Sequence, residues 1–324
     1  MRAIIPVAGF GSRLRPHTFT VPKVLLNVAG KPIIGHILDK IIEDGFDEAT
    51  IIVGHLGDKI REYVQSHYRI HVDFVEQTEA KGLAHAIYPA KDTFSTEPIL
   101  IILGDTIFDV NLKPVLGEKY TSIGVKEVTD PRRFGVVELH DNFAKHLIEK
   151  PENPTSNLAI VGLYWIRNPK LLVESIAELF KSDQRTKGEY QLTDALELML
   201  QHGEKIKTFL VDGWYDCGKP ETLLSTNQHL LEKQQENVVI KNVVIIPPVY
   251  VAKTATIIHS VIGPYATIAD RATVTDSIIR NSIVSEDAQV HKAVLEDSLV
   301  GVNALVEGTF NRINIGDSSE IEFH

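Results

Sequence analysis

A sixteen-residue period in the C-terminal part of the chain constrains the fold more than any other feature. Three aliphatic series follow it: Ile262, Ile278 and Val294; Ile268, Val284 and Val300; Val274, Val290 and Val306. Stretches of one pattern recur as VAKTATI, IGPYATI, VSEDAQV, VGVNALV and IGDSSEI. One turn of such a repeat cannot bury its aliphatic face alone, so stacked turns with hexapeptide-like sides predict a parallel β-helix over residues 236–324. A small β-sandwich, the alternative, would not explain one period held over several turns.

Before about residue 232, short aliphatic runs alternate with stretches of helical periodicity. Strands are expected at Ala3–Val7, Ala49–Val53, Val72–Val75 and Ile99–Leu103, and helices over 33–42, 83–90 and 220–235. This alternation predicts an α/β, Rossmann-like domain, and runs as aliphatic as ILIIL predict a mostly parallel sheet covered on both faces. We therefore predict a first domain of residues 1–235, with ligands at the carboxyl ends of its strands, and a second of residues 236–324.

The composition limits the classes of partner. Of the 324 residues 44% are hydrophobic, enough for a core, and the formal net charge is −10. So acidic a chain is not expected to bind nucleic acid or an anionic membrane, and any phosphate-binding cations must be local. Its one cysteine, Cys217, excludes an internal disulfide. Because the sequence shows neither a signal-peptide pattern nor a long apolar run, we expect a soluble cytoplasmic protein.

The stretch VAGFGSRLRPHTFTVPK, residues 7–23, follows the first expected strand and combines glycines with cations. Gly9 and Gly11 let backbone N–H groups approach an anion, while Arg13 and Lys23 can bind its oxygens. The dinucleotide pattern G-x-G-x-x-G lacks its third glycine, and the P-loop pattern lacks its G-K-[ST]. Residue types alone leave a phosphate site and a solvated surface loop as alternatives.

The longer stretch AGFGSRLRPHTFTVPKVLL resembles the signature G-x-G-T-R…P-K of the sugar-1-phosphate nucleotidylyltransferases, with Ser12 in place of the common threonine. Further motifs similar to those of that family follow in order: EQTEAKGLAHA, LGD, RRFGVVE, IEKP, GLYWI, GEYQLTDAL and WYDCGKPETLL. Many members also carry a C-terminal β-helix, so the resemblance implies a left-handed one in this chain. The long-type glucose-1-phosphate thymidylyltransferases look most similar, followed by the uridylyltransferases.

The resemblance implies a Mg²⁺-dependent enzyme that transfers a nucleotidyl group from dTTP, or from UTP, to a sugar-1-phosphate. Glucose-1-phosphate and dTTP are favoured, which would give dTDP-glucose and pyrophosphate. By resemblance, the nucleotide is bound by Ala8, Gly9, Gly11, Arg13, Gln77 and Gly82, and the sugar phosphate by Gly135, Glu149, Lys150 and Gly162. Arg13, Lys23, Asp105 and Asp216 would be catalytic, with Asp105 and Asp216 as the metal ligands. A homo-oligomer is also implied.

Two of these residues have support from their own chemistry. Asp105 ends the run LIILGD, at the strand end where a parallel sheet binds ligands, although an aspartate there often only caps backbone. Gln77 has both a donor and an acceptor, as pairing with the N3–H and O4 edge of thymine or uracil requires. Because the two bases differ by one methyl group, the choice between dTTP and UTP stays open.

Other classes of function also stay open. A regulatory subunit that senses nucleotide sugars without catalysis would be expected to lack some of the four charged catalytic residues, and all four are present. A bifunctional enzyme with an acyltransferase site in the β-helix could use His259 and His291, two sixteen-residue turns apart, although the usual long acyl-CoA loop is not evident. Thr193 or Asp194 could simply cap the helix that follows.

Overall fold

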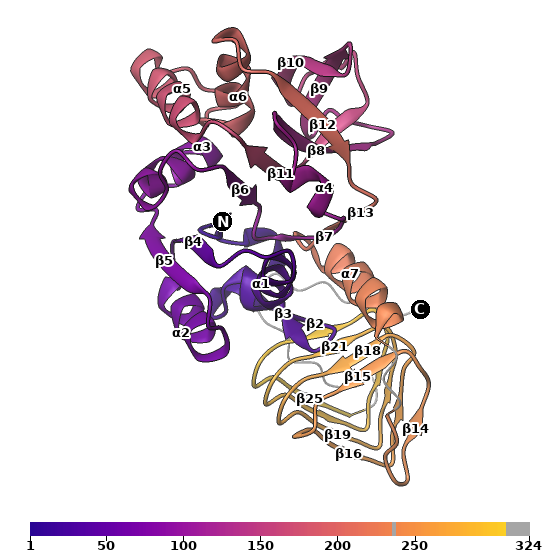
Figure 1. Ribbon diagram of the computed structural model, residues 1–324. Coiled ribbons are helices and arrows are strands. Elements are labelled where there is room, and N and C mark those ends of the chain that lie inside the picture. The colour runs from indigo at the N-terminus through magenta and orange to yellow at the C-terminus, as the bar shows by residue number, and fades with distance from the viewer. Residues whose placement is uncertain (235–237, 309–324) are drawn as a thin grey trace. The chain divides into compact units, whose positions relative to one another are not determined.

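The computed structural model describes residues 1–234 and 238–308 (Figure 1). The chain divides into two compact units. The first combines Met1–Gly9 with Ile37–Trp214, and the second combines Phe10–His36 with the chain from Tyr215 on. The glycine-rich and cationic segment therefore belongs mostly to the same unit as the C-terminal repeats, whereas the large sheet belongs to the other. The predicted domain boundary at residue 235 stays a prediction.

The first unit is built on a sheet of nine strands. In spatial order they are β5 (His71–Glu76), β4 (Glu48–Val53), β1 (Arg2–Pro6), β6 (Ile99–Ile102), β11 (Leu158–Ile166), β8 (Thr121–Glu127), β12 (Ile206–Leu210), β10 (Phe143–Glu149) and β9 (Gly135–His140). The first four run parallel. All four residues of β6 are buried, as expected for a strand of a parallel sheet covered on both faces.

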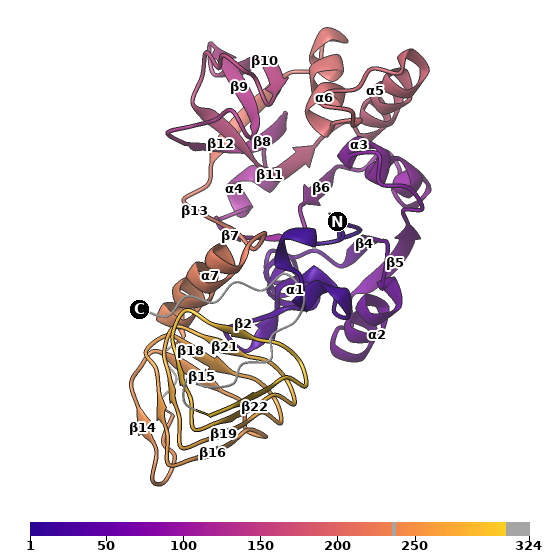
Figure 2. The same cartoon turned by 180° about the vertical axis from the view of Figure 1, so that it is seen from behind.

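Helices connect these strands. They are α1 (Ile33–Glu43), α2 (Gly57–His67), α3 (Leu83–Ile87), α4 (Lys113–Leu116), α5 (Pro169–Ser182) and α6 (Leu192–Gln201), with a 3₁₀ helix at Tyr88–Thr93. α5 and α6 lie side by side, and α6 packs against β10 (Figures 1 and 2). No helix within residues 1–234 and 238–308 is long and apolar enough to cross a membrane.

Antiparallel pairing begins at β11, which is antiparallel to β6, β8 and β9. β9 and β10 form a hairpin whose turn residues Asp141 (φ 49°) and Asn142 (φ 67°) are both left-handed, as two-residue hairpin turns require. β8 and β12 are parallel neighbours. The expectation of a mostly parallel sheet is thus right for the N-terminal half and wrong for the C-terminal half, where a direct hairpin replaces a helical crossover.

The second unit contains the segment after β1 and helix α7 (Pro220–Lys233), which is the helix predicted over 220–235. The segment forms 3₁₀ turns at Ser12–Leu14, His17–Phe19 and Lys23–Leu25, followed by the hairpin strands β2 (Asn27–Val28) and β3 (Lys31–Pro32). Two further short strands of the chain are β7 (Thr106–Asp109) and β13 (Gly213–Asp216).

After α7, residues 238–308 coil into three parallel sheets of four strands each, visible as columns in Figure 2. The first column is β14 (Val244–Ile245), β17 (Val261–Ile262), β20 (Ile278–Ile279) and β23 (Val294–Leu295). The second is β15 (Val249–Val251), β18 (Ala266–Ile268), β21 (Ile283–Val284) and β24 (Leu299–Val300). The third is β16 (Thr256–Ile258), β19 (Thr273–Thr275), β22 (Gln289–His291) and β25 (Leu305–Glu307). The parallel stacking predicted from the repeat is confirmed.

The strand register corrects one detail of the repeat. Val284 pairs with Val300 and Val290 with Val306, as the period of sixteen requires. Ile262, however, pairs with Ile279 and not with Ile278. The corner that follows Ile262 contains one residue more than the corner of the next turn, so the early turns are longer. The stretch IGDSSEI lies outside the described residues.

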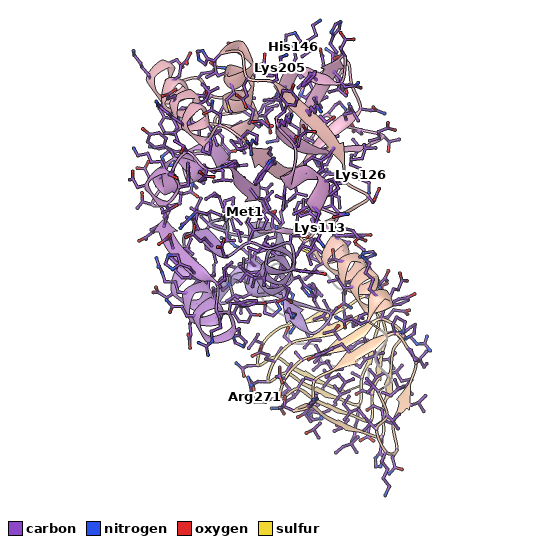
Figure 3. All side chains as sticks on the ribbon, viewed as in Figure 1. Met1, Lys113, Lys126, His146, Lys205 and Arg271 are labelled. Atoms are coloured by element: carbon purple, nitrogen blue, oxygen red, sulfur yellow. The ribbon has the colours of Figure 1, made fainter. Side chains whose placement is uncertain are left out.

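Charged side chains follow the same register along the edge of the coil. Arg271, labelled on the coil in Figure 3, donates from Nε to Asp287 Oδ1 at 2.8 Å and lies sixteen residues before it. The interior is apolar: Ile262, Ile268, Val274, Ile279, Val284 and Val290 are fully buried. The repeat therefore specifies both the core and the edge of the coil.

Candidate active site

In the first unit, the carboxyl ends of β1 and β6 lie against each other. A Cβ added to Gly104 would lie 2.3 Å from Val7 Cγ1, so that position accepts only glycine without rearrangement. Ala8 and Gly9 lie two and three residues after the end of β1, and Asp105 lies three residues after the end of β6. All three therefore occupy the edge of the sheet at which parallel α/β sheets bind ligands.

Gln77 and Gly82 belong to one loop after β5. The Nε2 atom of Gln77 donates to Glu79 O at 2.9 Å, and its second N–H and its oxygen give the amide further pairing capacity. The loop ends against Tyr190, whose N–H donates to Lys81 O at 2.8 Å. Gly82 has φ +109°, and a Cβ there would lie 2.5 Å from Tyr190 O. Backbone conformation and space both require glycine at this position.

Glu149, at the end of β10, is held at both carboxylate oxygens. Thr193 Oγ1 donates to Oε2 at 2.7 Å, and Lys150 Nζ lies 3.0 Å from Oε1. The side chain of Glu149 is 9% exposed. A Cβ on Gly135 would lie 2.8 Å from Thr193 Oγ1 and 3.0 Å from Ile160 Cδ1, so glycine leaves room for this cluster. The arrangement fixes one carboxylate and one ammonium beside each other, as binding a phosphorylated polyol would require.

Thr193, which the sequence offered only as a possible helix cap, contacts the predicted sugar-phosphate ligand Glu149. It does not cap α6, whose N-terminus has Gln191 in the N-cap position and no side-chain cap. Its neighbour Asp194 has a buried Oδ2 with no hydrogen-bond partner in the described part of the chain. Burial, with the charges of Glu149 and Glu197, raises the pKa of Asp194. The motif GEYQLTDAL was the available signal, but only tertiary packing reveals the bond to Glu149.

Gly162 lies in β11, where the pairing with β8 shifts register between Ile160 and Tyr164. Its φ is +91°, and an added Cβ would lie 2.5 Å from Leu103 Cδ1. Glycine is therefore required by the bulge itself. A contact of Gly162 with the sugar phosphate stays a prediction.

In the second unit, Gly11, Thr18 and Lys23 pack together. Gly11 has φ +62°, and its added Cβ would lie 3.0 Å from both Lys23 Cβ and Thr18 Cγ2. Thr18 Oγ1 donates to Gly11 O at 2.8 Å. Lys23 is only 8% exposed, which is unusual for lysine and uncommon in a solvated surface loop. This burial favours the phosphate-site interpretation of the segment.

Arg13 and Asp216 converge beside Gly218, also within the second unit. A Cβ on Gly218 would lie 2.8 Å from Arg13 Nη2 and 2.7 Å from Asp216 Oδ1. Cys217, between them in sequence, is fully buried, and its Sγ lies 3.7 Å from Thr226 Oγ1 of α7. The buried cysteine therefore fixes the backbone that presents Asp216, which is a structural role.

Asp105 and Asp216 fit a divalent cation by their chemistry. Carboxylate oxygens are the ligands that Mg²⁺ prefers, and one or two protein carboxylates suffice when substrate phosphates and water complete the shell. Across residues 1–234 and 238–308, no group of three or more His, Cys, Asp and Glu side chains forms a candidate metal centre. Asp105 belongs to the first unit and Asp216 to the second, and either carboxylate alone would leave most of the shell of a divalent cation to substrate oxygens and water.

The coil does not align the two histidines considered for a second site. His291 pairs in register with Thr275, and Thr275 pairs with Ile258, so His259 is one position out of line. The longer early turn of the coil causes this offset. Thr275 Oγ1 instead lies 2.6 Å from His291 Nδ1.

Comparison with known proteins identifies the family. A family model described as nucleotidyl transferase matches residues 2–233. The chain belongs to the nucleotidyl transferase family. All the predicted site residues of this nucleotidyl transferase, from Ala8 to Asp216, lie within the matched region.

Several curated nucleotidyl transferases and related proteins are similar over nearly the whole chain. The bifunctional protein GlmU of Methanocaldococcus jannaschii is 37% identical over 94% of this chain and 78% of its own. The low-salt glycan biosynthesis nucleotidyltransferase Agl11 of Haloferax volcanii is 31% identical over 99% of this chain and 100% of its own. The glucose-1-phosphate thymidylyltransferase of Streptomyces griseus is 28% identical over 99% of both chains.

Among solved structures, a UDP-glucose pyrophosphorylase in complex with UDP-glucose is similar, with a TM-score of 0.63 and 25% identity. The similarity covers 72% of this chain and 99% of that one. These relatives and the family model support a sugar-1-phosphate nucleotidylyltransferase.

Proposed function

We propose that this nucleotidyltransferase transfers a nucleotidyl group from dTTP, or from UTP, to glucose-1-phosphate. The observation that carries the proposal is the cluster around Glu149, in which Thr193 and Lys150 hold the two carboxylate oxygens. A fixed, nearly buried carboxylate can accept hydrogen bonds from sugar hydroxyls, and the adjacent ammonium can bind the phosphate. The thymidylyltransferase named among the relatives supports dTTP as the first choice.

The reaction joins a phosphate oxygen of the sugar-1-phosphate to the α-phosphorus of the nucleotide and breaks the bond to pyrophosphate. The attacking monoester is largely dianionic at pH 7, so it needs no general base. The enzyme instead has to bring two anions together and orient them for in-line attack. Glu149 and Lys150 would orient the nucleophile, while Gln77 would read the base edge.

Arg13 and Lys23 would bind the nucleotide phosphates: Arg13 would neutralise the charge that develops on the departing pyrophosphate, and Lys23 would lie near the α-phosphate. A fixed cation that meets charge in the transition state mainly raises kcat. Asp105 and Asp216 would be ligands of Mg²⁺, which when bound neutralises phosphate charge. The backbone of Ala8, Gly9 and Gly11 would approach the nucleotide without side-chain obstruction.

For the C-terminal part, we propose a left-handed β-helix of hexapeptide-like repeats, separated from the transferase domain at residue 235. The three columns of parallel strands support a coil of this kind. We also propose a homo-oligomer, as the resemblance implies.

The test is pyrophosphate release by the purified full chain with Mg²⁺ and glucose-1-phosphate, run with dTTP, UTP, GTP, CTP and ATP. We expect release with dTTP and UTP, and their ratio of kcat/KM assigns the base. If all five nucleotides are inert, the same panel is run with galactose-, mannose- and N-acetylglucosamine-1-phosphate. Failure with every sugar, in a protein that still binds dTTP, would contradict the proposal and favour a regulatory subunit.

A further inference from the structure

The β2–β3 hairpin follows the predicted catalytic Lys23 almost directly along the chain. The 3₁₀ turn of Lys23–Leu25 closes where Leu26 N donates to Lys23 O at 3.1 Å, and β2 begins at the next residue. Ala29 (φ 48°) and Gly30 (φ 86°) form the hairpin turn, with the two left-handed residues that such turns require. A displacement of the hairpin would therefore reach Lys23 through very little intervening chain.

The tip of this hairpin is held from two sides. Ala29 N donates to Asn227 Oδ1 of α7 at 2.8 Å, and Ala29 O accepts from Gln234 Nε2 at 3.0 Å. On the other side the ring of Tyr250, in β15, packs so closely on Gly30 that an added Cβ would lie 2.3 Å from it. The backbone of the turn is thus bonded to Asn227 and Gln234, and its surface packs on Tyr250 of the coil.

Asn227 connects the hairpin to the coil. Its side chain is fully buried. Besides accepting from Ala29, its Oδ1 accepts from Thr267 Oγ1 at 2.6 Å, and its Nδ2 donates to Tyr265 O at 3.1 Å. Removing this buried amide would break all three hydrogen bonds and leave their partners, Ala29 N, Thr267 Oγ1 and Tyr265 O, unsatisfied.

The parts of the cationic segment that precede this hairpin are packed on each other. Thr18 Oγ1 donates to Gly11 O, and Lys23 Cβ lies in the space that a side chain on Gly11 would need. His17, in the same segment, contacts the coil at Gly301, where an added Cβ would lie 3.3 Å from His17 Nδ1. The segment therefore touches the coil at a second, independent point.

We propose that the coil is the platform that positions the phosphate-binding segment, with Asn227 and Tyr250 as positioning residues for Lys23 and Arg13. This gives the C-terminal repeats a role within their own chain, independent of any oligomer or second activity. The proposal rests on the proposed function only for its kinetic readout. Neither positioning residue needs to touch a substrate.

The kinetic test uses the full chain with Asn227→Ala and Tyr250→Ala. A catalytic group displaced by about 1 Å can lower the rate by about a hundredfold. We therefore expect kcat to fall by about ten- to a hundredfold, measured well below the thermal midpoint of each variant. KM for the sugar-1-phosphate should stay within about twofold, because its proposed ligands Glu149 and Lys150 belong to the first unit.

Two matched controls separate positioning from general stability. Asn281→Ala removes a coil side chain that accepts from Gln228 Nε2 of α7 at 2.7 Å and donates to Asp297; within the described residues its side chain makes no hydrogen bond to the hairpin. Tyr250→Phe keeps the ring on Gly30 and should therefore lose less kcat than Tyr250→Ala. Asn281→Ala should keep kcat near that of the unchanged protein. Equal loss of kcat in Asn281→Ala, or an unchanged kcat in Asn227→Ala, would overturn the proposal.

Hydrogen exchange of the backbone amides provides a readout that does not depend on activity. In Asn227→Ala we expect faster exchange at residues 10–26 and unchanged exchange in β1, β4 and β6. If the unchanged protein transfers no nucleotide yet this pattern is found, the proposed function fails and the platform role stands. If exchange at residues 10–26 is unaffected, the platform role fails whatever the activity.

Discussion

Replacing Thr193 by valine removes the hydroxyl that holds Glu149 while keeping the size and branching of the side chain. Thr193 is 4% exposed, and its Oγ1 donates to Glu149 Oε2 at 2.7 Å. A hydrogen bond to a charged group contributes about 1.5–3 kcal/mol, and each 1.36 kcal/mol is a factor of ten in rate. If Glu149 binds the sugar, Thr193→Val should lower kcat/KM for glucose-1-phosphate by roughly ten- to a hundredfold.

The assay is steady-state pyrophosphate release. Glucose-1-phosphate is varied at saturating nucleotide, and the nucleotide is then varied at saturating glucose-1-phosphate. We expect the loss as a higher KM for the sugar phosphate, with KM for the nucleotide changed by less than about twofold, since the hydroxyl of Thr193 donates to a proposed sugar ligand. Thr193→Ser, which keeps the hydroxyl, is the control and should recover most of the loss. Equal losses for both substrates, or no loss in Thr193→Val, would refute this role for Glu149.

Three further predictions concern other residues. Lys23→Ala should lower kcat by about a hundredfold or more with smaller changes in KM, measured by the same assay, because its charge acts mainly in the transition state. Gly82→Ala should lower the thermal midpoint and raise KM for the nucleotide, since its φ of +109° and the backbone of Tyr190 exclude a side chain. Burial lowers the pKa of His17, so its contribution to stability is present above about pH 6.5 and is lost as the pH falls through its lowered folded value. His17→Gln should therefore flatten the loss of stability below that pH in chemical denaturation, and an unchanged profile would count against the burial of a neutral imidazole.

Much of the fold follows from local patterns in the sequence. Aliphatic runs such as that of β6 and the repeat of the coil are determined by burial alone, so the expected strands and the stacking were found. The register of Ile262 was wrong because one extra residue in a corner leaves the aliphatic pattern almost unchanged. The hairpin of β9 and β10 was missed because its turn, Asp141 and Asn142, carries no glycine.

The sequence could predict residues of the candidate site only where they lie in a recognisable motif. Gly82 and Lys23 lie in recognisable motifs. The structure shows the positive φ of Gly82 and the burial of Lys23. The contacts of Thr193 and Asn227 could not be found in this way, because each bonds to a partner far away in sequence. Glu149 precedes Thr193 by 44 residues, and Ala29 precedes Asn227 by 198.

If the protein joins the sugar phosphate to the α-phosphate of the nucleotide and releases pyrophosphate, ³¹P NMR can observe both substrates and both products at once. The protein is incubated with Mg²⁺, dTTP and glucose-1-phosphate, and the spectrum is followed over time. We expect the monoester and triphosphate signals to decline together while a sugar-linked diphosphate and pyrophosphate appear in equal amounts. Orthophosphate as the main product, or unchanged spectra with dTTP and with UTP, would contradict it.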